Sequence, residues 1–193
     1  MSADVHNPTV AVTDWQAALE LLKSGNKRFR ENKMLPRNVT DADRKALENG
    51  QKPFAAIISC SDSRLPPEVI FDQSIGNIFV LRNAGNTLDT SMLGTIEFAV
   101  EYLKAPLVVV MGHSYCAAVI TAFKGAGEFK GNLQSLLMDN IRPSVKDCSD
   151  DNDAIRANTK HVVGELEKND AVKRSGAKVV GAFYDIVTGE VTF

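Results

Sequence analysis

The stretch that decides the fold is Phe54-Ala55-Ala56-Ile57-Ile58-Ser59-Cys60-Ser61-Asp62-Ser63-Arg64, in which an apolar run ends on reactive side chains. A second stretch repeats this arrangement, because the apolar residues 107–111 lead to His113-Ser114-Tyr115-Cys116. Short apolar runs of this kind are typical of strands buried on both faces of a sheet. We therefore expect two buried strands whose ends carry Cys60 and His113.

Similar apolar runs and helical patterns alternate along the rest of the chain. Further strands are predicted over residues 78–81 and 178–184, and a short final strand over 190–193 follows a Thr188-Gly189 turn. Helical patterns cover residues 41–49, 68–72, 93–103, 115–123, 133–141 and 153–168. This alternation predicts an α/β fold with a central, mostly parallel β-sheet flanked by helices. We expect one domain over residues 1–193, with an N-terminal helical arm and connection over 1–50 and an α/β core over 54–193.

The N-terminal helix is predicted over residues 14–32. Thr13-Asp14-Trp15-Gln16 has the pattern of a capping box, with Thr13 at the N-cap and Gln16 at N3. An apolar stripe follows at helical spacing, formed by Trp15, Leu19, Leu22 and Phe29. No neighbouring segment obviously covers this stripe, so two alternatives remain: packing on a partner subunit, or docking on the chain's own core.

Composition places the chain among ordinary globular proteins. Its 193 residues are 44% hydrophobic and 24% charged, and the formal net charge is -2. That balance leaves no basic surplus for nucleic acid, so we expect a small-molecule ligand. Residues 1–12 lack a signal-peptide pattern, and no stretch reaches the roughly 18 apolar residues of a membrane span. We therefore expect a cytoplasmic protein without a membrane partner.

Cys60, His113 and Cys116 form a candidate metal site. In an open parallel sheet the functional crevice lies at the carboxyl ends of the strands, where Cys60 and His113 are predicted. Cys116, three residues after His113, can share its direction. Two thiolates and one imidazole leave the fourth position of a zinc ion open, which is the pattern of a catalytic site. The alternative for the cysteines is a pair of inert buried thiols, but the nearby His, Asp and Arg favour a metal.

Asp62 and Arg64 lie within four residues of Cys60. A surface ion pair is one interpretation, and such pairs contribute little to stability. A more specific role is that Asp62 orients a water on the metal or replaces it, while a bidentate pair with Arg64 keeps the carboxylate ionised.

Cys-x-Asp-x-Arg at residues 60–64, followed about fifty residues later by His-x-x-Cys at 113–116, resembles the signature of the β-class carbonic anhydrases. The similarity extends from about Trp15 to Phe193. It includes Glu68-Val69-Ile70-Phe71-Asp72-Gln73, Phe79-Val80-Leu81-Arg82-Asn83-Ala84-Gly85-Asn86, Gly94-Thr95-Ile96-Glu97-Phe98-Ala99 and the ending from Tyr184-Asp185 to Thr188-Gly189.

The resemblance implies Zn²⁺ as cofactor, with Cys60, His113 and Cys116 as ligands and Asp62 and Arg64 as catalytic residues beside them. It implies reversible hydration of carbon dioxide to bicarbonate and a proton by a zinc-bound hydroxide. It also implies homo-oligomers, dimers or dimers of dimers, with sites near the subunit interface. The N-terminal helix of this family commonly embraces the neighbouring subunit.

The resemblance further implies a substrate pocket. Its residues would be Gln51, Phe79, Ala84, Phe98 and Ala117. Gln51 is typical of plant-like members, which are not switched off by bicarbonate. The chain departs from the family pattern at Ala117, where Gly is usual, at Phe98, where plant-like members have Tyr, and at Tyr102, where they often have a titratable His.

Two alternatives to carbon dioxide hydration stay open at this point. The same site could hydrate carbonyl sulfide or carbon disulfide, which are also linear and apolar. The chain could also be a non-enzymatic zinc-binding homologue whose site is closed by Asp62. The presence of Asp62, Arg64 and Gln51 together favours an enzyme.

Overall fold

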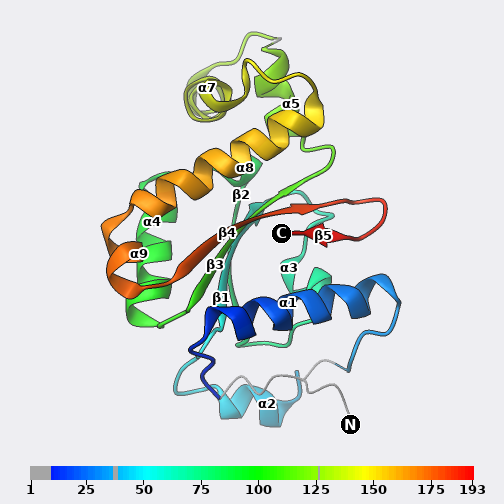
Figure 1. The fold of residues 1–193 in the computed structure, drawn as a ribbon, viewed down its shortest axis with the longest axis vertical. Coiled ribbons are helices and arrows are strands. Elements are labelled where there is room, and N and C mark those ends of the chain that lie inside the picture. The colour runs from blue at the N-terminus through cyan, green and yellow to red at the C-terminus, as the bar shows by residue number, and fades with distance from the viewer. Residues whose placement is uncertain (1–9, 37–38, 126) are drawn as a thin grey trace.

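A five-stranded sheet in the order β2-β1-β3-β4-β5 forms the centre of the computed structural model, which describes residues 10–36, 39–125 and 127–193 (Figure 1). The strands are β1 (Ala55–Cys60), β2 (Ile78–Asn83), β3 (Leu107–His113), β4 (Lys178–Tyr184) and β5 (Val191–Thr192). The first four are parallel, and β5 runs antiparallel to β4. The predicted α/β fold with a mostly parallel sheet is therefore confirmed.

Two helices precede β1, and the others lie in the connections between β1 and β4. They are α1 (Trp15–Arg30), α2 (Asp41–Ala46), α3 (Pro67–Ile70), α4 (Thr90–Glu97), α5 (Ala117–Lys124), α6 (Gly131–Gln134), α7 (Arg142–Val145), α8 (Asp151–Lys168) and α9 (Asp170–Ser175). A 3₁₀ turn, η1 (Ala84–Asn86), follows β2, and two π-helical segments, η2 (Phe98–Tyr102) and η3 (Ser135–Ile141), continue α4 and α6.

The sheet is covered on both faces, which explains why its central strands are apolar throughout. Every residue of β1 and β3 is buried. Because successive side chains of a strand point to opposite faces, Ile57 belongs to the core cluster shared with α1 and α5, and Ile58 to the cluster shared with α4 and α9. Helix α8 contributes to both clusters, through Ile155 and Val162. Figure 1 shows α4 and α9 on one side of the strands and α1 and α3 on the other.

Helix α1 begins one residue later than the capping pattern predicted. The side chain of Asp14, not that of Thr13, accepts the N–H of Ala17, so Asp14 is the N-cap. The prediction of Thr13 was wrong because both residues are good caps, and the carboxylate captures the free N–H group. The helix ends at Arg30, two residues before the predicted end.

The apolar stripe of α1 docks on the chain's own core, the second of the two alternatives. Leu22 is fully buried, and Trp15, Leu19 and Phe29 pack against the same cluster as β1 and β3. Gly25 permits the close approach, because a Cβ there would lie 1.8 Å from the carbonyl oxygen of Phe71.

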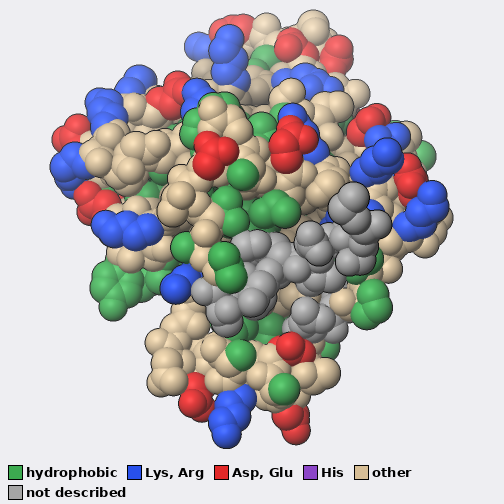
Figure 2. Space-filling view, turned by 60° about the horizontal axis from the view of Figure 1, so that its bottom comes forward, with side chains coloured by type: hydrophobic (Ala, Val, Ile, Leu, Met, Phe, Trp, Pro, Cys, Tyr) green, Lys and Arg blue, Asp and Glu red, His purple; other side chains and the backbone are tan. Residues whose placement is uncertain are grey.

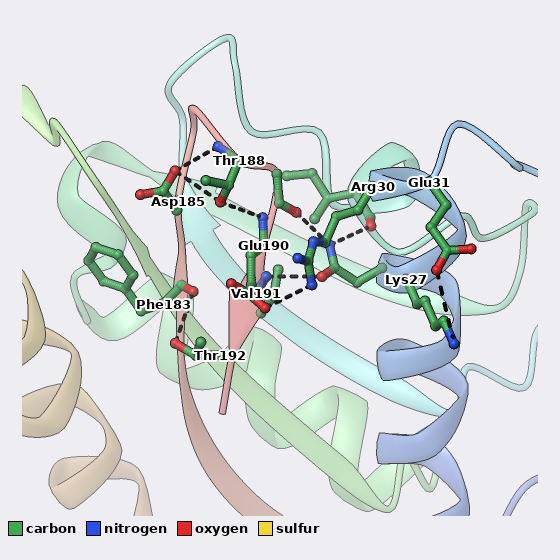
Figure 3. Close-up of polar contacts among 12 residues, drawn as sticks. Lys27, Arg30, Glu31, Phe183, Asp185, Thr188, Glu190, Val191 and Thr192 are labelled. Atoms are coloured by element: carbon green, nitrogen blue, oxygen red, sulfur yellow. Dashed lines mark hydrogen bonds and ion pairs between the residues drawn. The ribbon is translucent and has the colours of Figure 1, made fainter.

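The turn between β4 and β5 is tied to α1 (Figure 3). Asp185 Oδ1 accepts the N–H groups of Val187 and Thr188, which closes the turn, and Arg30 pairs with Glu190 at 2.7 Å. Beneath the turn, buried Asn26 donates to Gly189 O at 2.9 Å. Polar contacts thus hold the end of β5 against the N-terminal helix.

Charges of both signs are mixed on the face of the molecule shown in Figure 2. On the face in Figure 2, Lys and Arg side chains are interspersed with Asp and Glu side chains, and neither sign forms a continuous patch among the described residues. None of the helices in the described ranges combines the length and the apolar character needed to cross a membrane.

Candidate metal centre

The three predicted ligands meet at the carboxyl edge of the sheet. Cys60 ends β1, His113 ends β3, and Cys116 immediately precedes α5. All three are buried, and their candidate ligand atoms lie within 4.8 Å of one another. Because β1 and β3 are neighbouring parallel strands, they bring together residues that are 53 positions apart. The cluster of Cys60, His113 and Cys116 that the sequence pattern predicted is therefore present in the structure.

His113 presents one ring nitrogen without a partner. Its Nδ1 lies 2.9 Å from the carbonyl oxygen of Ser114, which can only accept, so the ring N–H is on Nδ1. The Nε2 atom then carries the lone pair, and it has no hydrogen-bond partner although it is buried. A buried acceptor without a donor fits a metal ligand held in one tautomer by its other nitrogen.

The two cysteines are placed for a shared ligand. Both are free thiols, and their Sγ atoms lie 3.9 Å apart. In a tetrahedral site with Zn–S bonds of about 2.3 Å, two sulfurs lie about 3.8 Å apart, so the spacing fits zinc. The thiol of Cys116 donates to Cys60, and this bond lowers the pKa of Cys60 well below its ordinary value. The same hydrogen bond, together with burial, raises the pKa of Cys116.

A loop from η1 supports Cys60 from the side of β2. The N–H of Gly85 points to Cys60 Sγ at 3.4 Å, and Asn158 of α8 donates to Gly85 O at 2.9 Å. Gly85 has φ +74°, and a Cβ would lie 2.8 Å from Ile141 Cδ1, so only glycine fits without strain. Gly85 lies in one of the motifs that resemble the family, whereas no sequence pattern indicated Asn158, which lies 98 residues after Cys60.

The turn between His113 and Cys116 is held by β4. The N–H of Ser114 donates to Tyr184 O at 3.0 Å, and Ser114 Oγ accepts the N–H of Ile186 at 2.9 Å. Tyr115 has φ +61°, a left-handed conformation that a bulky residue adopts at a cost. These contacts fix the direction in which Cys116 enters the site, and the sequence did not predict them.

Asp62 and Arg64 form the bidentate pair that the sequence predicted. Arg64 Nε donates to Asp62 Oδ1 at 2.9 Å, and its terminal nitrogen donates to Oδ2 at 2.7 Å. The Asp62 side chain is 18% exposed, and these hydrogen bonds hold the pKa of its carboxyl well below the usual range. Arg82 donates to the carbonyl oxygens of Cys60 and Asp62, so it fixes the backbone that carries the pair.

Two of the five predicted pocket residues lie next to the metal ligands. Ala84 follows Asn83, the β2 residue that pairs with Cys60, and Ala117 follows Cys116 directly. Ala84 is partly buried and Ala117 is exposed.

Gln51, Phe79 and Phe98 lie elsewhere in the chain. Phe79 pairs with Ala56, which lies four residues before Cys60 on β1. At about 3.3 Å per residue, Ala56 is about 13 Å from Cys60 along the strand. The rings of Phe79 and Phe98 are 6.3 Å apart, and Phe98 is 45% exposed. Gln51 precedes β1 and lines a cavity of about 450 Å³ together with Tyr102. One chain therefore does not bring these three residues to its own metal group.

The remaining cysteine and histidines take no part in this cluster. Cys148 is partly buried, and burial and nearby aspartates raise its pKa, which makes it a poor nucleophile at neutral pH. His161 lies exposed on α8, as the sequence indicated. His6 lies outside the described residues.

A comparison with known families matches residues 55–191 to carbonic anhydrase. The matched region covers β1 to β4, the first residue of β5 and the three candidate ligands. Carbonic anhydrase 2 of Mycobacterium tuberculosis is 41% identical over 131 residues, which is 67% of this chain and 63% of that protein. This chain thus spans less than two thirds of the length of that relative.

Solved structures share the fold. A tetrameric β-carbonic anhydrase from Sordaria macrospora is 28% identical, with a TM-score of 0.68, over 78% of this chain and 89% of that one. A β-carbonic anhydrase of Aspergillus fumigatus is also 28% identical, with a TM-score of 0.67, over 92% of this chain and 89% of that one.

Proposed function

Since this chain belongs to the β-carbonic anhydrase family, we propose that it is a zinc enzyme that catalyses the reversible hydration of carbon dioxide to bicarbonate and a proton. The observation that carries the proposal is the buried group of Cys60, His113 and Cys116, in which His113 Nε2 lacks any other partner. The two sulfurs and the nitrogen would hold a zinc ion through three protein ligands, which is the ligand number of catalytic rather than structural zinc sites.

Zinc in such a site supplies a Lewis-acidic centre that makes water nucleophilic near neutral pH. The protein's part is to hold the ligands in one arrangement. The Ser114 carbonyl fixes the His113 tautomer, and the Gly85 N–H stabilises negative charge on Cys60. These contacts leave the three ligand atoms little freedom to reorganise when a metal binds.

Asp62 acts as a hydrogen-bond acceptor for the water that takes part in the reaction. Its carboxylate stays ionised because Arg64 donates to both oxygens. The same pair restrains Asp62, which is two residues from Cys60 and, as a carboxylate, could itself bind the metal. Arg64 is therefore a positioning residue, and it keeps the carboxylate available without letting it close the site.

The substrate pocket is completed by a second copy of the chain. Ala84 and Ala117 flank the metal ligands of one chain, while Gln51, Phe79 and Phe98 lie at the other end of the strands. Strand β2 is an edge strand of the described sheet, and the stacked, exposed rings of Phe98 and Tyr102 lie near Phe79. A copy packed against this edge would place its own Gln51 and Phe98 beside the neighbour's Cys60, and it would cover the exposed aromatic surface.

Two finer assignments belong to the same proposal. The presence of Gln51 favours the plant-like subgroup, which bicarbonate does not switch off. The related Sordaria macrospora enzyme is tetrameric, which supports a dimer or a dimer of dimers here. A cytoplasmic location and a single domain over residues 1–193 stay predictions of the sequence.

Zinc content and turnover measured on one preparation test this function. We expect about one zinc per chain and rapid carbon dioxide hydration in the wild type. Cys60→Ser should lose most of both, whereas Cys148→Ser, a matched change outside the cluster, should keep both. Zinc without turnover would identify a non-enzymatic binding protein. Faster turnover of carbonyl sulfide than of carbon dioxide would replace the proposed substrate.

A further inference from the structure

Strand β5 covers only the end of β4. Strand β4 has 7 residues and β5 has 2, and the two pairs are Phe183 with Thr192 and Tyr184 with Val191 (Figure 1). Within the described part of the chain, residues 178–182 of β4 therefore have no strand partner on this side. A sheet edge with unpaired backbone groups is a template for another extended segment.

Hydrogen bonds at both ends of β4 show which of its backbone groups face this open edge. Lys178 donates its N–H to Pro106 O at 2.9 Å, and Tyr184 O accepts an N–H from the turn after β3 at 3.0 Å. The register with β3 is unbroken between these two residues. Because the backbone groups of successive strand residues point to alternate sides, the N–H and C=O of Val179 and Gly181 face away from β3.

A groove of about 270 Å³ lies beside this edge, between α8 and the two strands. Gly181 lines the groove, and a Cβ at this position would lie 3.5 Å from Thr159 and from Val163 of α8. The missing side chain of Gly181 therefore leaves room above α8. In a strand that continued β5, the residue opposite Gly181 would share this face of the sheet, and its side chain would project over the groove.

The charged side chains of the groove favour an acidic side chain at that position. Its lining includes Arg156 and Lys160, one turn apart on α8, and no carboxylate side chain. Both residues are exposed, and within the described ranges neither takes part in an ion pair. The guanidinium of Arg156 lies 4.0 Å from the centre of the Phe183 ring, which holds it close to the end of the open edge. A carboxylate could form charge-assisted hydrogen bonds here.

The opposite face of β4 favours apolar side chains. Ala182 is buried in the core cluster that includes α1 and α5, and Val180 packs against the same cluster. In an added strand, the residues between the acidic positions would point to this face. Apolar side chains at these positions would cover Val180 and remove apolar surface from water.

We propose that the open edge of β4 is a docking site for an extended segment of a partner protein, in which acidic and apolar residues alternate and which adds to the sheet in line with β5. Backbone hydrogen bonds to Val179 and Gly181 supply affinity, and Arg156 and Lys160 select acidic side chains. The site lies at the end of the sheet opposite to β2, so it is separate from the edge proposed for the second copy. It does not depend on the proposed enzymatic function.

Calorimetric titration of the zinc-loaded full-length protein with synthetic peptides tests the proposal. The probe is a hexapeptide of alternating Glu and Val with acetylated and amidated ends. The control peptide has Lys in place of every Glu, so it keeps the alternation and reverses the charge. We expect the Glu peptide to bind at least about tenfold more tightly than the Lys peptide. Equal affinities, or no binding of the Glu peptide, would overturn the proposal.

Methylated peptides test whether the backbone of the probe pairs with β4. Opposite an outward-facing residue of β4, the added residue exchanges two backbone hydrogen bonds, so the Glu amides bond to Val179 and Gly181. N-methylation of the Glu residues removes these donors and keeps the charge, and it should weaken binding at least about tenfold. N-methylation of the Val residues changes amides that face away from β4, and it should leave most of the affinity. Equal losses for the two peptides would show that the probe does not add as a strand.

Charge reversal on α8 locates the site. Lys160→Glu should weaken binding of the Glu peptide about tenfold and should strengthen binding of the Lys peptide. Lys168→Glu is the matched control, because Lys168 is also exposed on α8 but does not line the groove. It should leave both affinities at the wild-type level. If Lys160→Glu changes neither affinity, the probe binds elsewhere and the assignment to this groove fails.

Amide exchange followed by NMR reports on the edge itself. The N–H of Gly181 should exchange with solvent at least about tenfold more slowly when the Glu peptide is bound. The N–H of Ala182 faces β3, so its exchange provides the reference. Unchanged exchange at Gly181 would overturn pairing with β4. A wild type that binds no peptide, together with a smaller mass of Lys160→Glu in sedimentation, would show that a second copy occupies the edge and would also overturn the proposal.

Discussion

Asn158 donates its side-chain amide to the carbonyl oxygen of Gly85 at 2.9 Å, and so connects α8 to the loop that touches Cys60. Asn158→Ala removes this donor and leaves the loop less well fixed. Residues that orient metal ligands typically contribute about 10–100-fold to metal affinity or activity, and we expect a loss of zinc affinity in this range. Competition with a chromophoric chelator measures it.

Asn140→Ala is the matched control for this variant. Asn140 and Asn158 line the same surface cavity, but Asn140 is exposed. It should bind zinc as the wild type does. An Asn158→Ala protein that has the circular dichroism spectrum of the wild type and unchanged zinc affinity would show that the loop holds Cys60 without help from α8.

Removing the guanidinium beside Asp62 should separate metal binding from turnover. In Arg64→Ala the carboxylate loses both side-chain donors and keeps only the backbone N–H of residue 64, so it is freer to move towards the metal ligands. We expect carbon dioxide hydration to fall at least about tenfold while zinc content is unchanged. Arg64→Lys should rescue little, because a single ammonium group cannot reproduce the bidentate geometry.

Arg174 offers a control of the same chemistry. It pairs with Glu101 through two nitrogens, at 3.1 and 2.8 Å, on the surface of the protein. Arg174→Ala should leave turnover at the wild-type level, since exposed pairs contribute little. Turnover near the wild-type rate in Arg64→Ala as well would make the Asp62 pair a surface ion pair.

Zinc binding should release about one proton near pH 7.5, not two. The hydrogen bond from Cys116 lowers the pKa of Cys60, so that sulfur is already ionised, whereas the pKa of Cys116 is raised and its thiol must give up a proton. As pH falls, protons compete better for Cys116, so zinc affinity falls by about tenfold per pH unit. Calorimetry in buffers of different ionisation enthalpy counts the proton, and a count near two would show that both thiols are protonated in the metal-free protein.

Asn26 should contribute strongly to the free energy of unfolding through the hydrogen bonds of its side chain. It is 4% exposed, its Nδ2 donates to Ile70 O and Gly189 O, and its Oδ1 accepts the N–H of Val191. Asn26→Ala leaves these backbone groups without partners, and we expect a loss of about 3 kcal/mol in the free energy of unfolding. Urea titration measures it. Lys23→Ala, an exposed change in the same helix, should cost less than about 0.5 kcal/mol.

The sequence allowed the strands and the metal ligands to be predicted for one physical reason. Strands buried on both faces must be apolar at every position, so their ends are sharp, and residues 178–184 were predicted with the bounds of β4. Ends of neighbouring parallel strands then had to converge, which placed Cys60 beside His113.

Contacts between distant polar residues could not be predicted in this way. Asn26 interrupts the apolar face of α1 and is buried only because three backbone groups of other segments need it. Asn158 likewise lies in α8, and the helical pattern of α8 does not indicate that this side chain binds the carbonyl oxygen of Gly85. Helix α9 was missed because Asn169 ends α8 in an extended conformation and caps the next helix with the same side chain.

The assignment of Gln51 to a partner's site can be tested by complementation. If the site uses Cys60 from one chain and Gln51 from another, Cys60→Ser and Gln51→Ala damage the same site from opposite sides. A mixed dimer then has one doubly damaged site and one intact site. Co-expression of the two inactive variants should therefore restore roughly a quarter of the wild-type turnover, because half of the dimers are mixed and each has one good site.

The control pairs two changes on the same side of the site. Cys60→Ser with His113→Ala should restore nothing, since every site in a mixed dimer keeps one damaged metal group. Gln51→Ala alone must first be shown to have low turnover with normal zinc content. Failure of the Cys60→Ser and Gln51→Ala pair to restore activity, with mixed dimers demonstrated by differential tags, would mean that Gln51 serves no neighbouring site. The substrate would then be held by Ala84, Ala117 and other residues of the same chain, and the exposed rings of Phe98 and Tyr102 would need a different partner.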